Sequence, residues 1–180
     1  MTGLPDPLAD HAKFTLSGDD ASAVIASLND AGQSISSGIF FEDGILYAPP
    51  AMTAQVTSAV TNIATARKAA LKAYAAAVRF SKETGGMTVN GHAYPTDRET
   101  QSKLTAAVVM SQVNTSATFQ WKAEDGFVQL NAAGILAVAQ AIGGYVQGCF
   151  AAEQAIAAAI DGGTITTKEQ VDGYGWPPSS

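Results

Sequence analysis

The chain has 180 residues, enough for one folded domain that holds itself together through a hydrophobic core. Hydrophobic residues make up 47% and charged residues only 14%, against a usual charged share of about 25%, so unusually little charge is available to cover the surface. The net charge of −6 disfavours a nucleic-acid-binding protein, because the affinity of such proteins comes largely from neutralising phosphates.

The N-terminal part is predicted to hold a short helix and a hairpin. Its first residues, MTGLPDPLADHAKF, lack the basic and apolar regions of a signal peptide, and we expect an irregular lead-in there. A short helix is expected over about 20–29. A hairpin should follow over 39–47, around the turn dipeptide Asp43-Gly44.

The first long helix is predicted over 53–84, after Pro49-Pro50 and before the helix-ending pair Gly85-Gly86. Alanine accounts for 34 of the 180 residues, and it favours helices because it loses the least side-chain entropy there. Apolar side chains recur along this range every three or four residues: Val56, Val60, Ile63, Leu71, Tyr74 and Val78.

Two hairpins and a helix are expected next. The first hairpin spans 87–94 around Asn90-Gly91, a dipeptide suited to a type I′ turn. A helix should cover 97–113, because Thr96 and Glu99 form the pattern of a capping box. The second hairpin joins 119–122 to 127–130, where apolar and polar residues alternate.

The second long helix is predicted over 131–161, with Asn131 as its N-cap and Gly162-Gly163 after its end. One apolar stripe has alternating spacings of three and four residues, as in a helix that packs along a neighbour. The stripe consists of Ile135, Val138, Ile142, Tyr145, Cys149, Ala152, Ile156 and Ala159.

A second face of this helix has little side-chain bulk, with Gly144 and Gly148 beside Gln140, Gln147 and Gln154, which recur at heptad spacing. Two interpretations remain open. In the first interpretation, other chains pack on this face, and the glutamines stay hydrated or form hydrogen bonds between chains. In the other, this is the buried central helix of a single domain.

A membrane span over 132–152 is disfavoured, because no Lys or Arg flanks this uncharged stretch and glutamines interrupt it. Beyond the helix, Thr166-x-x-Glu169 is typical of a capped turn, and residues 173–180 are expected to form a flexible C-terminal tail.

The predicted fold class is mainly α: a helical bundle built on two long alanine-rich helices, with short β-hairpins as a minor component. Three segments result, an N-terminal segment over 1–86, a helical domain over 87–172 and the tail over 173–180. Gly85-Gly86 is the only candidate domain boundary.

The titratable side chains form no recognisable catalytic motif. His92 follows a tight turn and His11 lies in the lead-in, and neither has a partner that the sequence identifies. Cys149, the only cysteine, falls on an apolar helix face, where a thiol behaves as a small inert hydrophobe. One cysteine and two histidines cannot supply a conventional structural zinc site. We therefore expect no enzyme, no catalytic residues, no cofactor and no metal.

Aromatic side chains are the better candidates for contact with a partner: Trp121, Tyr145, Phe150 and Trp176. Tryptophan packs in cores and at interfaces alike. Core packing is the favoured interpretation for Trp121. Both interpretations remain open for Trp176, which lies among glycines and prolines.

Several short motifs follow one another in the second half of the chain, over roughly residues 87–172. They are Val89-Asn90-Gly91, Thr96-Asp97-Arg98, Phe119-x-Trp121 before Asp125-Gly126, Tyr145-x-x-x-Cys149-Phe150-x-x-Glu153 and Ile165-Thr166-Thr167-Lys168-Glu169. Their order resembles a small domain of unknown function that recurs in tailed bacteriophages. In that family the domain typically occurs in proteins of the tail-fibre region, including tail-fibre assembly proteins or chaperones. The family supplies no catalytic residues.

The resemblance implies a non-enzymatic phage protein of the virion tail, or of the host cytoplasm during assembly. It would bind the tail-fibre or baseplate polypeptide, as an assembly chaperone or as a retained subunit. The main alternative is a homo-oligomeric connector of the virion tail. An enzyme of unknown type and a small membrane protein are less favoured. We expect a homo- or hetero-oligomer, with no nucleic acid and no membrane as partner.

Overall fold

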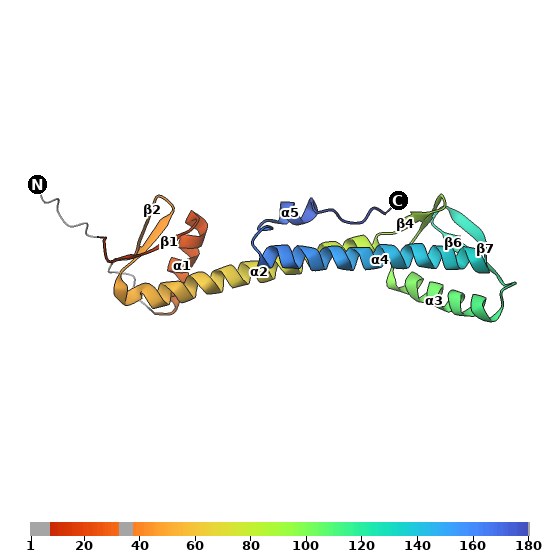
Figure 1. Cartoon of the computed structure of the whole chain (residues 1–180), viewed down its shortest axis with the longest axis horizontal. Coiled ribbons are helices and arrows are strands. Elements are labelled where there is room, and N and C mark those ends of the chain that lie inside the picture. The colour runs from red at the N-terminus through yellow and green to blue at the C-terminus, as the bar shows by residue number, and fades with distance from the viewer. Residues whose placement is uncertain (1–7, 33–37, 180) are drawn as a thin grey trace, which may run out of the picture. The chain divides into compact units, whose positions relative to one another are not determined.

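The computed structural model describes residues 8–32 and 38–179 and is mainly α-helical with a minor β component (Figure 1). The chain divides into two compact units, Met1–Ala69 and Ala70–Ser180. Each unit has its own hydrophobic core.

The first unit combines a small sheet with a short helix and the beginning of a long one. Its elements are β1 (Ala12–Thr15), α1 (Gly18–Asp30), β2 (Phe40–Glu42), β3 (Ile45–Ala48), the 3₁₀ turn η1 (Pro50–Met52) and the start of α2 (Thr53–Thr84). The strands are antiparallel in the order β1-β3-β2. The predicted short helix and the predicted hairpin are confirmed as α1 and β2–β3.

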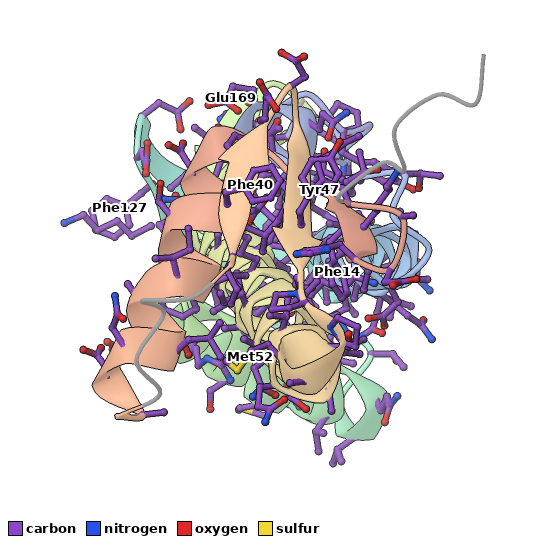
Figure 2. The ribbon with its side chains drawn as sticks, turned by 90° about the vertical axis from the view of Figure 1, so that its left-hand side faces the viewer. Phe14, Phe40, Tyr47, Met52, Phe127 and Glu169 are labelled. Carbon is purple, nitrogen blue, oxygen red and sulfur yellow. The ribbon has the colours of Figure 1, made fainter. Side chains whose placement is uncertain are left out.

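The two faces of this sheet differ. Leu46 and Ala48 of β3 are buried against Val24 of α1 and Val56 of α2. The opposite face carries the stacked rings of Phe40 and Tyr47, whose centroids lie 4.7 Å apart (Figure 2). The alternation of inward and outward residues along β3 sets this arrangement.

The expectation of an irregular lead-in was wrong for residues 12–14, which belong to the strand β1, while residues 1–7 lie outside the described residues. Phe14 packs against the core of the unit, and Lys13 lies opposite Tyr47 in the ladder. A four-residue strand carries little signal of its own, and this one forms because β3 offers it an edge to pair with.

The second unit is built around the long helix α4. After the end of α2 come β4 (Met87–Val89), β5 (His92–Tyr94), α3 (Arg98–Val113), β6 (Thr118–Ala123), β7 (Gly126–Asn131), α4 (Ala132–Asp161) and α5 (Lys168–Asp172). The strands form two separate antiparallel hairpins, as predicted. At the first turn Asn90 and Gly91 have φ values of 51° and 84°, the left-handed conformation that a type I′ turn requires.

Both ends of α4 lie where the sequence predicts them. The Asn131 side chain caps the helix by accepting a hydrogen bond from the Gly134 amide, and Gly162 follows its last turn. The predicted apolar stripe is buried except for Ala159, which is half-buried, while Ile160 takes the inward position beside it.

The predicted start of α3 was wrong by one residue. Asp97, and not Thr96, is the N-cap, because its carboxylate accepts the Thr100 amide at 2.8 Å. The Thr96 hydroxyl is buried and accepts the amide of Gly86 at 2.9 Å, so it ties the helix start to the loop after α2. The same one-residue offset occurs at α5, where Thr167 and Gln170 form the capping box expected of Thr166 and Glu169.

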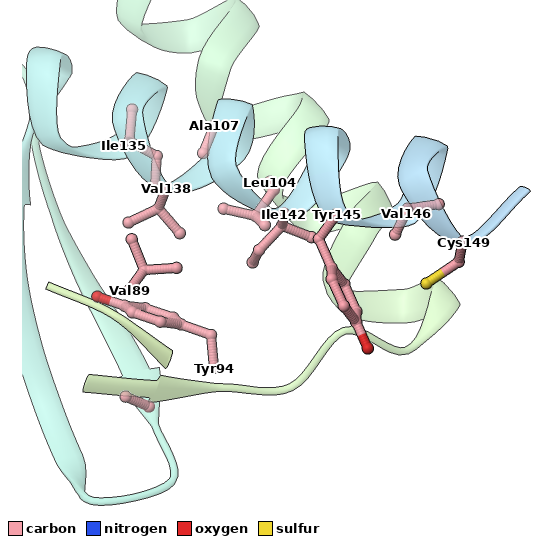
Figure 3. Close-up of a cluster of buried hydrophobic side chains, with 11 residues drawn as sticks. Val89, Tyr94, Leu104, Ala107, Ile135, Val138, Ile142, Tyr145, Val146 and Cys149 are labelled. Atoms are coloured by element: carbon pink, nitrogen blue, oxygen red, sulfur yellow. The ribbon is translucent and has the colours of Figure 1, made fainter. Parts of the chain in front are cut away.

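Residues from β4, β5, α3 and β6 meet on the buried side of α4, and β6 contributes Ala123 (Figure 3). Leu104 and Ala107 come from α3, and Val89 and Tyr94 come from the first hairpin. The members on α4 itself are Ile135, Val138, Ile142, Tyr145, Val146 and Cys149. Farther along α4, Ile156 and Ile160 form another cluster.

The division between the compact units falls within α2, and not at Gly85-Gly86. The physical reason is that Leu71 and Ala75 of α2 pack with Ile156 and Ile160 of α4, so the last part of the helix belongs to the second unit.

The C-terminal segment over 173–179 is held by specific contacts. The Trp176 indole donates a hydrogen bond to the Val171 carbonyl at 2.9 Å, and the Ser179 carbonyl accepts the Thr88 amide at 2.8 Å. Pro177 packs so closely on Gly148 that a Cβ there would lie 2.9 Å from the proline ring. Gly148, predicted on the face with little side-chain bulk, therefore makes room for this segment.

The cap assignment at α3 leads to a prediction. Asp97→Ala should lower the free energy of unfolding by about 1 kcal/mol, because the Thr100 amide loses its acceptor. Urea denaturation measures this, and Asp97→Asn is the matched control that keeps a capping oxygen. If Asp97→Ala were no less stable than Asp97→Asn, the cap would be assigned to the wrong residue.

Candidate interaction surface

The side of α4 that faces away from the core is exposed along almost the whole helix. One line of residues there has alternating spacings of four and three, and every member is exposed. We call these residues the α4 outer stripe: Ala133, Ala137, Gln140, Gly144, Gln147, Ala151, Gln154 and Ala158. No charged residue occurs between Ala132 and Ala152. The helix is therefore uncharged on two opposite sides, and its own unit buries only one of them.

A groove of about 470 Å³ runs between α3 and α4 beside this stripe. Its apolar lining includes Val109 and Leu136, which are 55% and 42% exposed. Gln140 and Gln147 belong both to the groove and to the stripe, so the two form one continuous surface. The sequence did not predict this groove. The run Val108-Val109-Met110 was the available signal, since one helix face cannot bury three consecutive apolar residues.

An ion network centred on the buried carboxylate of Glu83 holds the helices that carry this surface. Glu83 of α2 is only 1% exposed and faces Arg79 at 2.6 Å and Arg98 at 3.3 Å. Arg79 also donates to Glu153 of α4 at 2.7 Å, and its guanidinium lies 4.5 Å from the centroid of the Phe150 ring. Burial opposes the charge of Arg79, but the two carboxylates outweigh it and raise its pKa. The network is a clamp between α2, α3 and α4.

The four predicted contact residues do not share one accessible surface. Phe150 alone among them is exposed. Trp121 packs on the core beneath α4, which is the favoured interpretation of the sequence, and Trp176 is half-buried with its indole hydrogen-bonded. Tyr145 is buried, its hydroxyl donates to the Lys82 carbonyl at 2.9 Å, and burial raises its pKa to about 12. Tyr145 is thus a packing residue in this structure.

The remaining titratable candidates also occupy structural positions. His92 of the first hairpin lies 2.9 Å from the Asp125 carboxylate in the turn of the second, a partner that the sequence did not identify. Cys149 is buried, and this burial raises the pKa of its thiol, which opposes formation of the reactive thiolate. His11 is half-buried beside Phe40. Over the described ranges, no three His, Cys, Asp or Glu side chains gather as a metal would require.

Length and composition alone would allow α4 to cross a membrane. This is weak evidence for a span, because core helices of soluble proteins pass the same test, and one third of its most apolar window, 33%, is buried in the fold.

The ion network predicts unequal costs for two Glu→Gln variants. Glu83→Gln should lower the free energy of unfolding by about 2 kcal/mol, because Arg79 and Arg98 lose the buried carboxylate between them and Arg79 keeps only Glu153 as a counter-charge. Glu99→Gln, which loses an exposed pair with Lys103, should cost no more than about 0.5 kcal/mol. Chemical denaturation measures both losses. Equal losses of unfolding free energy would show that the Glu83 network does not hold the helices together.

The hairpin contact predicts a pH dependence. The hydrogen bond with His92 lowers the pKa of Asp125. The stability that it contributes is therefore present above the unfolded pKa of about 3.9 and lost as the pH falls through the lower folded value. Between about pH 4 and about pH 2, the unfolding temperature of the wild type should fall more steeply than that of Asp125→Asn. If the unfolding temperatures of the two proteins fell equally over this pH range, the contact between His92 and Asp125 would not stabilise the protein in solution.

Comparison with known proteins gives one result for most of the second unit. Residues 66–173, from within α2 to just after α5, match the family described as a domain of unknown function, DUF4376. No similar curated protein and no similar solved structure was found. The match covers more than half of the chain, which therefore belongs to the DUF4376 family.

Proposed function

We propose that this protein is a non-enzymatic bacteriophage tail protein that binds the tail-fibre or baseplate polypeptide. The observation that carries the proposal is the uncharged exposed surface formed by the α4 outer stripe and the α3–α4 groove. Exposed apolar side chains that gather on one face, as Val109 and Leu136 do beside the groove, are typical of a protein–protein interaction site. The protein acts as a fibre-assembly chaperone or remains as a subunit.

The phage setting is supported by the order of motifs in the second unit, which resembles the tail-associated domain. Those motifs are distributed over its whole length, from the β4–β5 turn to α5. The corresponding location is the virion tail, or the host cytoplasm during assembly. The proposal needs no catalytic residue, cofactor, nucleic acid or membrane.

The chemistry of the groove indicates what the partner offers. Val109 and Leu136 provide apolar contact, and the amides of Gln140 and Gln147 provide neutral hydrogen-bonding groups at its edge. A fibre segment that fits would present apolar side chains without charge, since a charged group would lose its water and find no counter-charge on this face. Assembly intermediates expose such segments before they fold.

A second candidate is a homo-oligomeric structural connector of the virion tail. The heptad regularity of the α4 outer stripe favours it, because this spacing lets one helix pack along another. In that case the helical bundle built on α2 and α4 would continue across subunits.

Coexpression tests the leading proposal. The full chain should raise the soluble yield of a phage tail-fibre polypeptide that is coexpressed with it and should copurify with it. Val109→Glu should reduce copurification about tenfold or more, because it places a carboxylate in the groove. Ser102→Glu, at an exposed position of α3 outside the groove lining, is the matched control and should bind as the wild type does. An unchanged fibre yield with no copurification would reject the proposal.

Washed virions separate the two roles. A transient chaperone should be missing from mature particles, whereas a retained subunit or connector should appear at fixed stoichiometry by mass spectrometry.

A further inference from the structure

We propose that the C-terminal segment over 173–179 is a displaceable ligand of a peptide-binding site on its own unit, and that the same segment of a second copy of this chain also binds there. The site lies on a different side of α4 from the α3–α4 groove, because Gly148 borders the segment while Gly143 borders the groove. The inference goes beyond the proposed function. Its test requires no fibre polypeptide, so either proposal can fail without the other.

Two side chains of the segment meet complementary groups of the second unit. The Trp176 ring centroid lies 6.0 Å from Nζ of Lys82 on α2, at the outer limit of a cation–π contact. The same ring packs, half-buried, on the apolar cluster around Ile156. Pro177 packs on Gly148 of α4, where a Cβ would lie 2.9 Å from Cγ of the proline ring. A residue without a side chain thus stands where the proline is seated.

The backbone of the segment extends the contact to a strand. The Ser179 carbonyl accepts a hydrogen bond from the Thr88 amide of β4 at 2.8 Å, at the end of a path that runs from α5 along α4 (Figure 1). β4 pairs with β5 alone in its two-stranded sheet, so this amide belongs to the free edge of the sheet. Extended peptides bind such edges through their backbone, while pockets for their side chains give specificity. The segment is bound in this manner.

The segment is a surface ligand and not part of the core. Tyr174, Trp176 and Pro177 are half-buried, and the other residues over 173–179 are exposed. The Trp176 indole donates to the Val171 carbonyl, and α5 offers this carbonyl to a segment from either source. Because the segment lies at the end of the described chain, it can leave the site without disrupting another element.

The segment is close to its bound shape before it binds. Pro177 and Pro178 have a fixed φ and favour an extended polyproline II backbone. Trp176 precedes a proline, which biases its own backbone toward the extended region. A ligand that is already held in its bound conformation loses little conformational entropy on binding. The segment therefore binds as a preformed peptide.

A second copy of this chain is the occupant that fits the site. Every contact that the segment makes within one chain is available to the same segment of another chain, which is the basis of exchange between protomers. No charged residue occurs over 173–179, so the segment adds no repulsion between chains of net charge −6. The covalent tether raises the effective concentration of a chain's own segment, so exchange is favoured where many copies gather.

Binding of a synthetic peptide tests the site. The peptide has the sequence of residues 173–179, an amidated end and a fluorescent label. The host is the full chain with Trp176→Ala, which weakens its own segment. Fluorescence anisotropy should show binding about tenfold tighter or more to this host than to the wild type, whose tethered segment competes. Gly148→Gln, added to the host, should abolish binding, because the new side chain fills the position of Pro177.

Gly144→Gln is the matched control and should leave binding unchanged, since a Cβ there would meet nothing within 4 Å in the described part of the chain beyond its own helix. Circular dichroism checks that each host keeps its helix content. If Trp176→Ala does not, Pro177→Gly replaces it as the host, because it removes the ring on Gly148 and keeps the indole. Absence of binding to a folded host, binding that Gly148→Gln leaves intact, or equal affinity of the host and the wild type would each overturn the proposal.

Mixing two full-length variants tests the second copy. Gly148→Gln blocks the site and frees the segment, whereas Trp176→Ala leaves the site open and weakens the segment. Sedimentation above the dissociation constant of the peptide should show a one-to-one complex that neither variant forms alone. A chain with both substitutions should not bind Trp176→Ala. If the peptide binds and the two variants do not combine, the second copy is the wrong occupant and the proposal is overturned.

Discussion

The central constraint on this protein is that α4 is uncharged on two opposite sides while its own unit can bury only one of them. Leu104, Val89, Tyr94 and their neighbours cover the inner side. The outer side keeps alanine, glycine and glutamine in contact with water. Lys or Glu at these positions would increase the solubility of the protein without changing its core. The fold therefore does not require these residues to be uncharged, and their neutrality points to contact with another molecule.

The rest of the second unit holds this helix in place and leaves the outer side open. Glu83, Arg79 and Glu153 connect α2 to α4, and Arg98 extends the clamp to the start of α3. The C-terminal segment packs on another side of α4, where Pro177 contacts Gly148. A surface on a rigid scaffold binds with less loss of conformational entropy than a mobile loop does. The fold is therefore suited to presenting a fixed helical face.

Much of the fold was predictable because its signals are local. Asn90-Gly91 and Asn131 act within a few residues of themselves, and they fix a turn and a helix start. The strand β1, the carboxylate clamp and the groove depend on contacts between distant segments, which one sequence does not specify. Thr96 shows the boundary between the two cases. It fits a local capping pattern, but a buried contact with Gly86 takes its hydroxyl, and Asp97 caps the helix.

The accessibility of single cysteines along α4 tests the account most directly. Cysteines introduced at Ala137, Gly144 and Ala151 should react slowly with a thiol reagent in the complex with the fibre polypeptide and quickly in the chain alone. A cysteine at Ala66, exposed on α2, should react quickly in both. Protection confined to the outer side of α4 is the predicted result. Equal and rapid reaction at all four positions, with and without the fibre polypeptide, would show that nothing covers this side and would contradict the account.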